Sequence, residues 1–192
     1  MNFWTKEEFN LFKSYIKDDF EFTLITEILF FTGIRKGELL ALTLNNFDFE
    51  NKKMYIQYSY QRINKEDILT LPKTPRSRRT ITLPNFLCEK IKEYASKRYD
   101  YKSDERLFIV SKYCLHRKLN NIIKKYNLKK IRIHDFRHSH VALLIEMNVP
   151  ILLIAERLGH DSPETTLKIY GHLYPNKHQE IAEQLNVLES QK

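Results

Sequence analysis

Apolar residues recur with two different periods along the chain, and this change of period is what most constrains its fold. Phe9 and Phe12 follow the capping-box sequence of residues 5–8 at helical spacing. Across residues 54–60 apolar and polar residues instead alternate, which is typical of a half-buried strand, and residues 80–83 supply its partner. Helical spacing then returns. The sequence therefore predicts a mainly α-helical fold with a small antiparallel β-sheet, of the α+β class.

The other predicted elements follow from the same spacing. Further helices are expected at residues 20–31, from about residue 36, after Pro84, and at residues 114–126, 134–147, 150–158, 162–170 and 177–189. Residues 107–110 predict a short strand, and the basic, proline-broken residues 65–79 predict a connection between the two sheet strands. Since no repeat, low-complexity tract or linker interrupts the chain, we expect one domain over residues 1–192.

The charge balance favours a polyanionic partner. Lys and Arg total 32 against 24 Asp and Glu, for a formal net charge of +8. Such an excess favours nucleic acid, because binding releases the counterions condensed on the phosphates. A basic surface that only keeps the protein soluble is the alternative. The chain has only 4 glycines, which argues against a Gly-rich nucleotide-binding loop.

Cysteine usage and hydropathy indicate an intracellular setting. Cys88 and Cys114 are isolated, so they predict free thiols rather than a metal cluster or a disulfide framework. The apolar residues 24–34 are too few to span a membrane and include Glu27. No basic-then-apolar signal pattern opens the sequence. We therefore expect a soluble, cytoplasmic protein with no membrane partner.

Two arginines are candidates for phosphate binding. Arg35 and Arg137 flank apolar residues in helix-forming segments, where a guanidinium group needs an acceptor. Its planar fork matches phosphate oxygens, so a pair can hold both non-bridging oxygens of one phosphodiester and stabilise the charge that develops there. For Arg35, a structural ion pair with Glu38, one helical turn away, is the alternative.

Tyr170 is a candidate nucleophile only in the company of other groups. A tyrosine hydroxyl has a pKa of about 10, so it reacts poorly until neighbouring cations or a base activate it. One tyrosine among 11 is by itself more often a packing residue.

The histidines around Arg137 allow more than one interpretation. His134 and His138 are four residues apart, so they could face one way on a helix and bind zinc. The short acid Asp135, the neighbouring Arg137 and the lack of a third ligand speak against a metal. The alternative is that His138 and His140 hydrogen-bond the backbone inside a helical bundle.

The order of these motifs resembles that of a known family. Thr32-Gly33-Ile34-Arg35 with Glu38, a lysine in a strand hairpin, His134-x-x-Arg137-His138, Leu158-Gly159-His160, and Tyr170 ten residues later follow one another. Single motifs of this kind occur by chance, but their joint order and spacing closely resembles the tyrosine recombinases. The resemblance covers nearly the whole chain, from about residue 5 to residue 188.

This resemblance implies DNA cleavage and rejoining by a covalent 3′-phosphotyrosine intermediate. Arg35 and Arg137 would clamp the scissile phosphate, His160 would hydrogen-bond it, and Tyr170 would attack it. The product is a phosphotyrosine ester and a free 5′ hydroxyl. Because one phosphate ester is exchanged for another, no nucleotide cofactor is implied.

Two further roles are implied in the same way. Lys73 would be the general acid for the leaving 5′ oxygen, and His134 would assist proton transfer around the nucleophile. Cationic side chains would take the place of the metals that many phosphoryl-transfer enzymes use, so no metal is expected.

Double-stranded DNA is the implied partner. Six basic residues outside the catalytic set are predicted to contact its phosphates: Arg76, Arg78, Arg79, Lys112, Arg117 and Lys118. A solvated surface is the alternative for each of them.

The resemblance also implies an assembly. The full-length protein would act as a homotetramer on DNA, the isolated domain would be a monomer, and the family's N-terminal core-binding domain would be absent from this chain. A C-terminal segment with Ile181, Leu185 and Leu188 at helical spacing would pack on its own domain or on a neighbouring subunit.

Two other functions fit the same residues less well. A type I topoisomerase would use the same tyrosine chemistry without paired sites, but the short chain and the residue 32–35 and 158–160 motifs favour the recombinase. All six expected catalytic positions are filled, which counts against a DNA-binding module that has lost catalysis.

Overall fold

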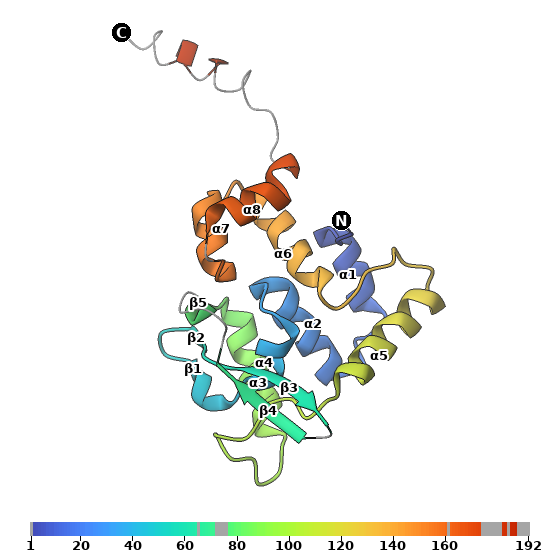
Figure 1. Ribbon diagram of the computed structural model, residues 1–192. Coiled ribbons are helices and arrows are strands. Elements are labelled where there is room, and N and C mark those ends of the chain that lie inside the picture. Colours follow the sequence, from blue (N-terminus) through green and yellow to red (C-terminus); the bar gives the residue numbers. More distant parts are fainter. Residues whose placement is uncertain are drawn as a thin grey trace.

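The chain folds mainly into helices, with two small sheets at one side (Figure 1). The computed structural model describes residues 2–64, 66–71, 77–160, 162–173, 182–183 and 185–187. The helices are α1 Lys6–Ser14, α2 Phe20–Thr32, α3 Lys36–Ala41, η1 Leu44–Asn46, α4 Asn85–Ser96, α5 Lys112–Lys125, α6 Asp135–Glu146, α7 Ile151–Leu158, α8 Pro163–Tyr170 and η3 Gly171–Leu173. The strands are β1 Phe47–Asp48, β2 Lys53–Ile56, β3 Ser59–Ile63, β4 Glu66–Thr70 and β5 Arg79–Thr82. The predicted α+β class, rich in helix, is confirmed.

Aromatic packing joins α1 to the central helix α2. The capping box predicted at residues 5–8 is present, with the Thr5 hydroxyl accepting from the Glu8 amide and the Glu8 carboxylate accepting from the Thr5 amide. It orients α1 so that Phe9 stacks on Phe30 of α2, with ring centroids 3.9 Å apart. Because α2 is buried on nearly all sides, it forms the axis of the large core.

The sheet differs from the prediction in two ways. The expected strand at residues 54–60 is broken after Ile56, so β2 pairs with β1 and β5 while β3 begins a separate hairpin with β4. Strand β4 lies in the segment predicted as a connection. It escaped detection because its polar, mostly exposed residues carry no alternating apolar signal.

The predicted strand at residues 107–110 is wrong. Leu107 and Phe108 are fully buried, which explains their strand-like apolar pattern. Only a single backbone bond of 2.6 Å, from the Leu107 amide to the Leu42 carbonyl, ties this segment to its neighbour. One bond does not make a ladder, so the chain crosses the core as irregular structure.

Helices α6, α7 and α8 build a second, smaller core cluster at one end of the molecule (Figure 1). It contains Val141 and Ile145 from α6, Ile154 and Leu158 from α7, and Tyr170 from α8. Helix α6 runs between this cluster and the large core, because its first turns pack on α2. Most of the helix predicted at residues 177–189 lies outside the described residues. In the described part of the chain, no helix has the length and hydropathy needed to cross a membrane.

Candidate active site

Two glycine turns bring separate helices to one point. Gly33 ends α2 and Gly159 ends α7, both in the left-handed conformation, with φ of 66° and 65°. Glycine adopts this conformation without steric cost. The carbonyl groups of Gly33 and Leu158 then face inward, where both accept hydrogen bonds from Arg137 of α6, at 2.7 and 2.8 Å.

Arg137 is a buried cation held by carbonyl groups. Arg137 is only 4% exposed. Among the described residues, no carboxylate lies within ion-pair distance of its guanidinium group. Burial, together with the nearby charges of Arg35 and Arg79, lowers the pKa of Arg137 to about 9, so it stays charged at neutral pH. The carbonyl ends of α2 and α7 stabilise that charge. A guanidinium group has five N–H donors, and these two bonds leave the others for an anion.

The ion pair between Arg35 and Glu38, given above as the alternative to phosphate binding, is present. Nη1 of Arg35 lies 2.9 Å from Oε1 of Glu38, while the Arg35 side chain remains 40% exposed. Glu38 is buried and also accepts two bonds from Arg79 of β5, at 2.8 and 3.1 Å. The Glu38 carboxylate thus fixes two arginines, and Arg35 keeps an exposed face beside Arg137.

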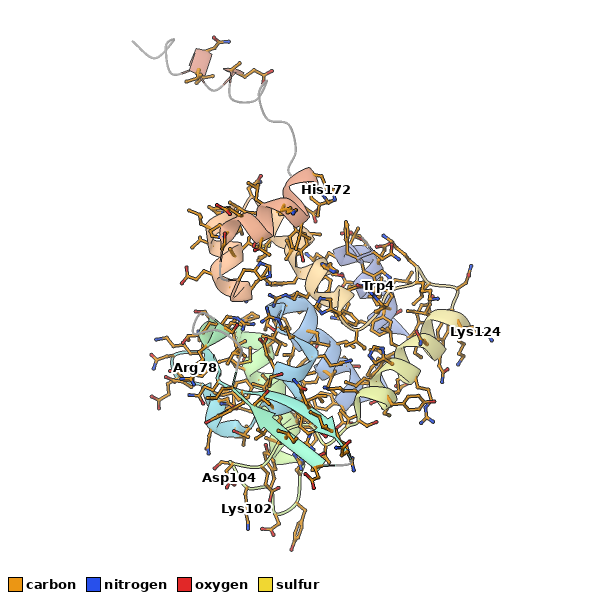
Figure 2. All side chains as sticks on the ribbon, in the orientation of Figure 1. Trp4, Arg78, Lys102, Asp104, Lys124 and His172 are labelled. Carbon is orange, nitrogen blue, oxygen red and sulfur yellow. The ribbon has the colours of Figure 1, made fainter. Side chains whose placement is uncertain are left out.

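Arg79 is anchored inside the protein. Its side chain is 5% exposed, and besides Glu38 it bonds the carbonyl groups of Ser77 and Arg157. This geometry gives Arg79 a structural role that the sequence did not indicate, and its predicted contact with DNA stays a prediction. Arg78, by contrast, is exposed at the edge of the molecule beside β5 (Figure 2).

Tyr170 is enclosed next to this arginine group. It is 2% exposed, and its phenol oxygen lies 2.6 Å from Nδ1 of His138. Burial raises the pKa of Tyr170 to about 12, against the opposing effect of the Arg137 charge. In this arrangement the phenol is protonated and bonded to an imidazole.

His138 was assigned the wrong partner from the sequence. It bonds Tyr170 rather than the backbone, and its Nε2 lies 3.9 Å from Oδ1 of Asp135. Burial and the neighbouring His134 lower the pKa of His138, which favours a neutral ring that can accept the phenol proton. For His140 the expected backbone bond is present, since its Nδ1 lies 2.8 Å from the Phe30 carbonyl oxygen.

His134 stands at the start of α6, facing the same way as His138. The two rings are nearly perpendicular, with centroids 5.3 Å apart. Burial and the charge of Arg137 lower the pKa of His134. Within the described ranges no three His, Cys, Asp or Glu side chains are grouped to hold a metal ion.

His160 lies just beyond the Gly159 turn. Its Nδ1 is 2.6 Å from the hydroxyl oxygen of Thr166, which sets the orientation of the ring. The imidazole lines a cavity of about 490 Å³ together with Gly159, Arg78 and Arg79. His160 therefore lies beside Arg79, which shares the Glu38 carboxylate with Arg35.

Of the remaining predicted residues, two lie outside the described residues and three lie on α5. Lys73 and Arg76 lie outside the described residues, so their roles stay predictions. Lys112, Arg117 and Lys118 all lie on α5, where Lys118 pairs with Asp19 and Arg117 lies over the ring of Tyr113. Their contact with DNA also stays a prediction.

The fold and the sequence place this chain among the phage-type integrases. Its helical body with small antiparallel sheets is the fold of tyrosine recombinase catalytic domains, since it matches the catalytic domain of bacteriophage HP1 integrase with a TM-score of 0.61 over 98% of this chain and 97% of that one, at 20% identity. Residues 3–177 match the sequence model of the Phage integrase family. The chain belongs to this family of site-specific recombinases.

Several relatives carry the same similarity. The ICEBs1 integrase of Bacillus subtilis (strain 168) is 37% identical over 202 residues, covering 98% of this chain and 55% of that protein. Tyrosine recombinase XerA of Pyrococcus furiosus is 31% identical, and the match covers 91% of this chain and 58% of that protein. The Tn1549 transposon integrase, solved in complex with circular intermediate DNA, has a TM-score of 0.80 at 20% identity, covering 97% and 67%. The chain thus spans about half the length of the curated relatives it matches.

Proposed function

We propose that this chain is the catalytic domain of an enzyme that cuts and rejoins double-stranded DNA through a covalent 3′-phosphotyrosine link to Tyr170. One observation carries the proposal: the buried Arg137, with donors left for an anion, lies beside both Arg35 and the phenol of Tyr170. A site that holds one phosphate between two guanidinium groups next to a hydroxyl nucleophile is suited to phosphoryl transfer.

The positions of Tyr170, His138, Arg35 and Arg137 support the first steps, and the role of Lys73 rests on family membership alone. The phenol oxygen of Tyr170 attacks phosphorus, and its proton passes to Nδ1 of His138, 2.6 Å away. Arg35 and Arg137 neutralise the charge that grows on the non-bridging oxygens. As the new bond forms, the bond to the 5′ oxygen breaks, and Lys73 protonates that oxygen.

His160 and His134 complete the site. His160 hydrogen-bonds the phosphate from the edge of the cavity next to Arg79. His134, whose ring lies beside that of His138, assists proton transfer around the nucleophile. One phosphate ester replaces another, so neither a nucleotide nor a metal is required for the step.

The burial of Tyr170 sets a condition on the reaction. Because the phenol is 2% exposed, α8 must shift for a DNA phosphate to reach it. Helix α8 packs in the small cluster with α7 rather than in the large core, so this movement leaves the main body intact. In the whole protein we expect the active form to be a tetramer on DNA, a proposal that rests on family membership.

A nicked duplex tests the proposal directly. A nick placed close to the cleavage site lets the cut fragment diffuse away, which traps the covalent intermediate. A set of nicked duplexes that carry different candidate sites is compared. We expect a protein–DNA adduct that withstands denaturation, forms in the presence of EDTA, and is absent with Tyr170→Phe.

Tyr99→Phe is the matched control, because Tyr99 is fully exposed and lies outside the site. This variant should form the adduct as the wild type does. An adduct that persists in Tyr170→Phe, or that forms only with added metal, would contradict the mechanism.

A further inference from the structure

A second cationic group lies next to the arginine site, on the surface between α3 and α5. Lys36 directly follows Arg35 and opens α3, while His116 stands on α5. The ammonium nitrogen of Lys36 lies 2.8 Å from Nε2 of His116. Lys112, four residues before His116 and therefore on the same face of α5, adds a second positive charge.

Two basic nitrogens at this separation share one hydrogen bond. The ammonium group of Lys36 donates, so Nε2 of His116 must be unprotonated to accept. Protonating His116 would place two full positive charges in direct contact, which is strongly unfavourable at the edge of a protein. Burial and the charge of Lys36 accordingly lower the pKa of His116, and burial and Lys112 lower the pKa of Lys36.

The surroundings supply no counter-charge to this group. In the described part of the chain, no carboxylate forms an ion pair with Lys36, Lys112 or His116. Asp67 of β4 is engaged elsewhere, since its carboxylate bonds Arg106 and accepts from the hydroxyl of Tyr60. The ring of Tyr60, which carries no charge, lies with its centroid 5.8 Å from the Lys112 nitrogen.

The neighbouring groups along α5 are also engaged. Lys118 is paired with Asp19 at the start of α2, and Arg117 lies over the ring of Tyr113. Among the described residues, the cluster of Lys36, Lys112 and His116 thus has no acidic ion-pair partner, and an anion would relieve its repulsion.

We propose that Lys36, Lys112 and His116 bind a backbone phosphate of DNA, and that His116 takes up a proton from solvent as the phosphate binds. This inference rests on the proposed function, because it takes the phosphate held by Arg35 as the neighbour of the one bound here. Consecutive Cα atoms are about 3.8 Å apart, and phosphates follow one another every few ångströms along a strand. Arg35 and Lys36 therefore reach phosphates of the same short stretch of DNA.

A change of protonation on binding distinguishes this site from a pair of permanently charged side chains. Without DNA the Lys36–His116 pair carries one positive charge. With a phosphate beside it, both nitrogens donate to phosphate oxygens and the pair carries two charges. Binding through this site is therefore tighter at lower pH, with the added proton held by His116 only in the complex.

The experiment uses the 192-residue chain carrying Tyr170→Phe, so that binding is measured without cleavage. Its affinity for a short fluorescent duplex is determined by anisotropy at low salt, from about pH 5 to about pH 8. His116→Gln, which keeps a polar side chain but cannot gain a proton, is compared with it. His172→Gln, an exposed histidine beyond α8, is the matched control.

In the parent, we expect duplex binding to take up one more proton than in His116→Gln. The Kd of the parent should therefore rise with pH by up to about tenfold more per pH unit than that of His116→Gln. His172→Gln should show the same pH dependence as the parent. Other histidines near the scissile phosphate also titrate, but they contribute equally to all three proteins. If His116→Gln binds the duplex with the same pH dependence as its parent, the proposal is overturned.

NMR titration of the His116 ring provides an independent readout. In the free protein, Lys36→Gln should raise the pKa of His116, because it removes the adjacent cation. In its parent, the duplex should raise that pKa, and inorganic phosphate at the same concentration should not. An equal effect of inorganic phosphate would assign the site to free anions and overturn the proposal.

These results separate the two proposals. Proton-linked duplex binding through His116 without any Tyr170 adduct would support this site and contradict the proposed catalysis. A Tyr170 adduct, together with duplex binding whose pH dependence is the same in His116→Gln, would support the proposed catalysis and contradict this site. Absence of any duplex binding would overturn both.

Discussion

The phenol oxygen of Tyr170 lies 2.6 Å from Nδ1 of His138, and this contact joins α8 to α6, the helix that carries Arg137. It keeps the proposed nucleophile bonded to a base while the phenol is buried. The Nε2 side of the same ring faces Asp135 at 3.9 Å, which favours the tautomer that accepts at Nδ1. His138 is thus placed to hold the phenol and to receive its proton.

The first prediction concerns His138→Asn. The asparagine oxygen can still accept a hydrogen bond from Tyr170, but it cannot take up a proton. We expect adduct formation at neutral pH to slow by about 100-fold or more, as for loss of a general base. Single-turnover cleavage of the nicked duplex measures this rate.

The pH profile gives a second readout for the same variant. Burial lowers the pKa of His138 below its ordinary value of 6.5, so the ring is neutral at pH 7 and becomes charged only as the pH falls below that value. Wild-type cleavage should therefore decline on the acid side, and this decline should be weaker in His138→Asn. If His138→Asn leaves both the cleavage rate and its decline at acidic pH unchanged, a group other than His138 accepts the phenol proton of Tyr170.

The second prediction compares the two phosphate-binding arginines. Arg35→Ala and Arg137→Ala should each lower the cleavage rate by at least about 100-fold, because each removes a donor to the developing charge. Their effects on stability should differ. Arg137→Ala leaves the buried carbonyl groups of Gly33 and Leu158 without a donor, which costs about 1–3 kcal/mol.

Arg35→Ala should destabilise by less than about 1 kcal/mol, because its side chain is 40% exposed and Glu38 keeps Arg79 as a partner. Urea unfolding of both variants, beside the cleavage assay, tests the difference. Near-wild-type cleavage in either one would count against a shared phosphate site.

Local signals in the sequence predicted the helices, and the fold follows from them. The Thr5 capping box and the helical spacing of Phe9 and Phe12 place α1, and five later helices begin and end within two residues of the expected positions. Strand β4 was missed because an exposed hairpin needs no apolar alternation. The segment at residues 107–110 was misassigned because a buried irregular chain and a buried strand have the same apolar run.

The site was partly predictable for the same physical reason. The Arg35–Glu38 pair lies within one helical turn, so spacing alone indicated it. The contact of His138 with Tyr170 joins residues 32 positions apart, and Glu38 meets Arg79 across 41 positions. No local pattern encodes such contacts. The one available signal was the shared helix face of His134 and His138, which favoured a common role beside Arg137.

The third prediction concerns the glycine turn that presents its carbonyl to Arg137. In Gly33→Ala the left-handed φ of 66° becomes strained, and the new Cβ would lie 2.5 Å from Cδ2 of His140. The conformation alone costs about 1–2 kcal/mol, and the steric clash adds to it. We expect a loss of at least this size in urea unfolding, together with slower cleavage because the support of Arg137 shifts.

Gly171→Ala is the matched control for this substitution. Gly171 has an ordinary helical φ of −55°, and a Cβ there would meet only Leu167, at 3.4 Å. Its stability should stay the same or rise by about 0.4–1 kcal/mol, because alanine restricts the unfolded chain. Equal losses in both variants would mean that the Gly33 turn has no special strain.

The fourth prediction concerns the charge of Glu38. Burial would raise the pKa of this carboxyl, but its hydrogen bonds and ion pairs with Arg79 and Arg35 outweigh burial and lower it. A folded-state pKa below the unfolded one contributes stability that is present above the unfolded value and is lost as the pH falls through the folded value. Glu38→Gln, which keeps the shape but not the charge, should therefore destabilise the protein at pH 7 by up to about 3–5 kcal/mol.

This difference should narrow below the ordinary glutamate pKa of 4.5, because the unfolded wild type then takes up a proton at Glu38 while the folded carboxyl, with its lowered pKa, still resists protonation. Urea unfolding at pH 7 and near pH 4 measures both values. Glu93→Gln is the control, because Glu93 pairs with Lys97 in an exposed i,i+4 bridge and should change stability by no more than about 0.5 kcal/mol at either pH. A Glu38→Gln deficit that is constant with pH would show that the packing of Glu38, rather than its charge, holds Arg79 and Arg35 in place.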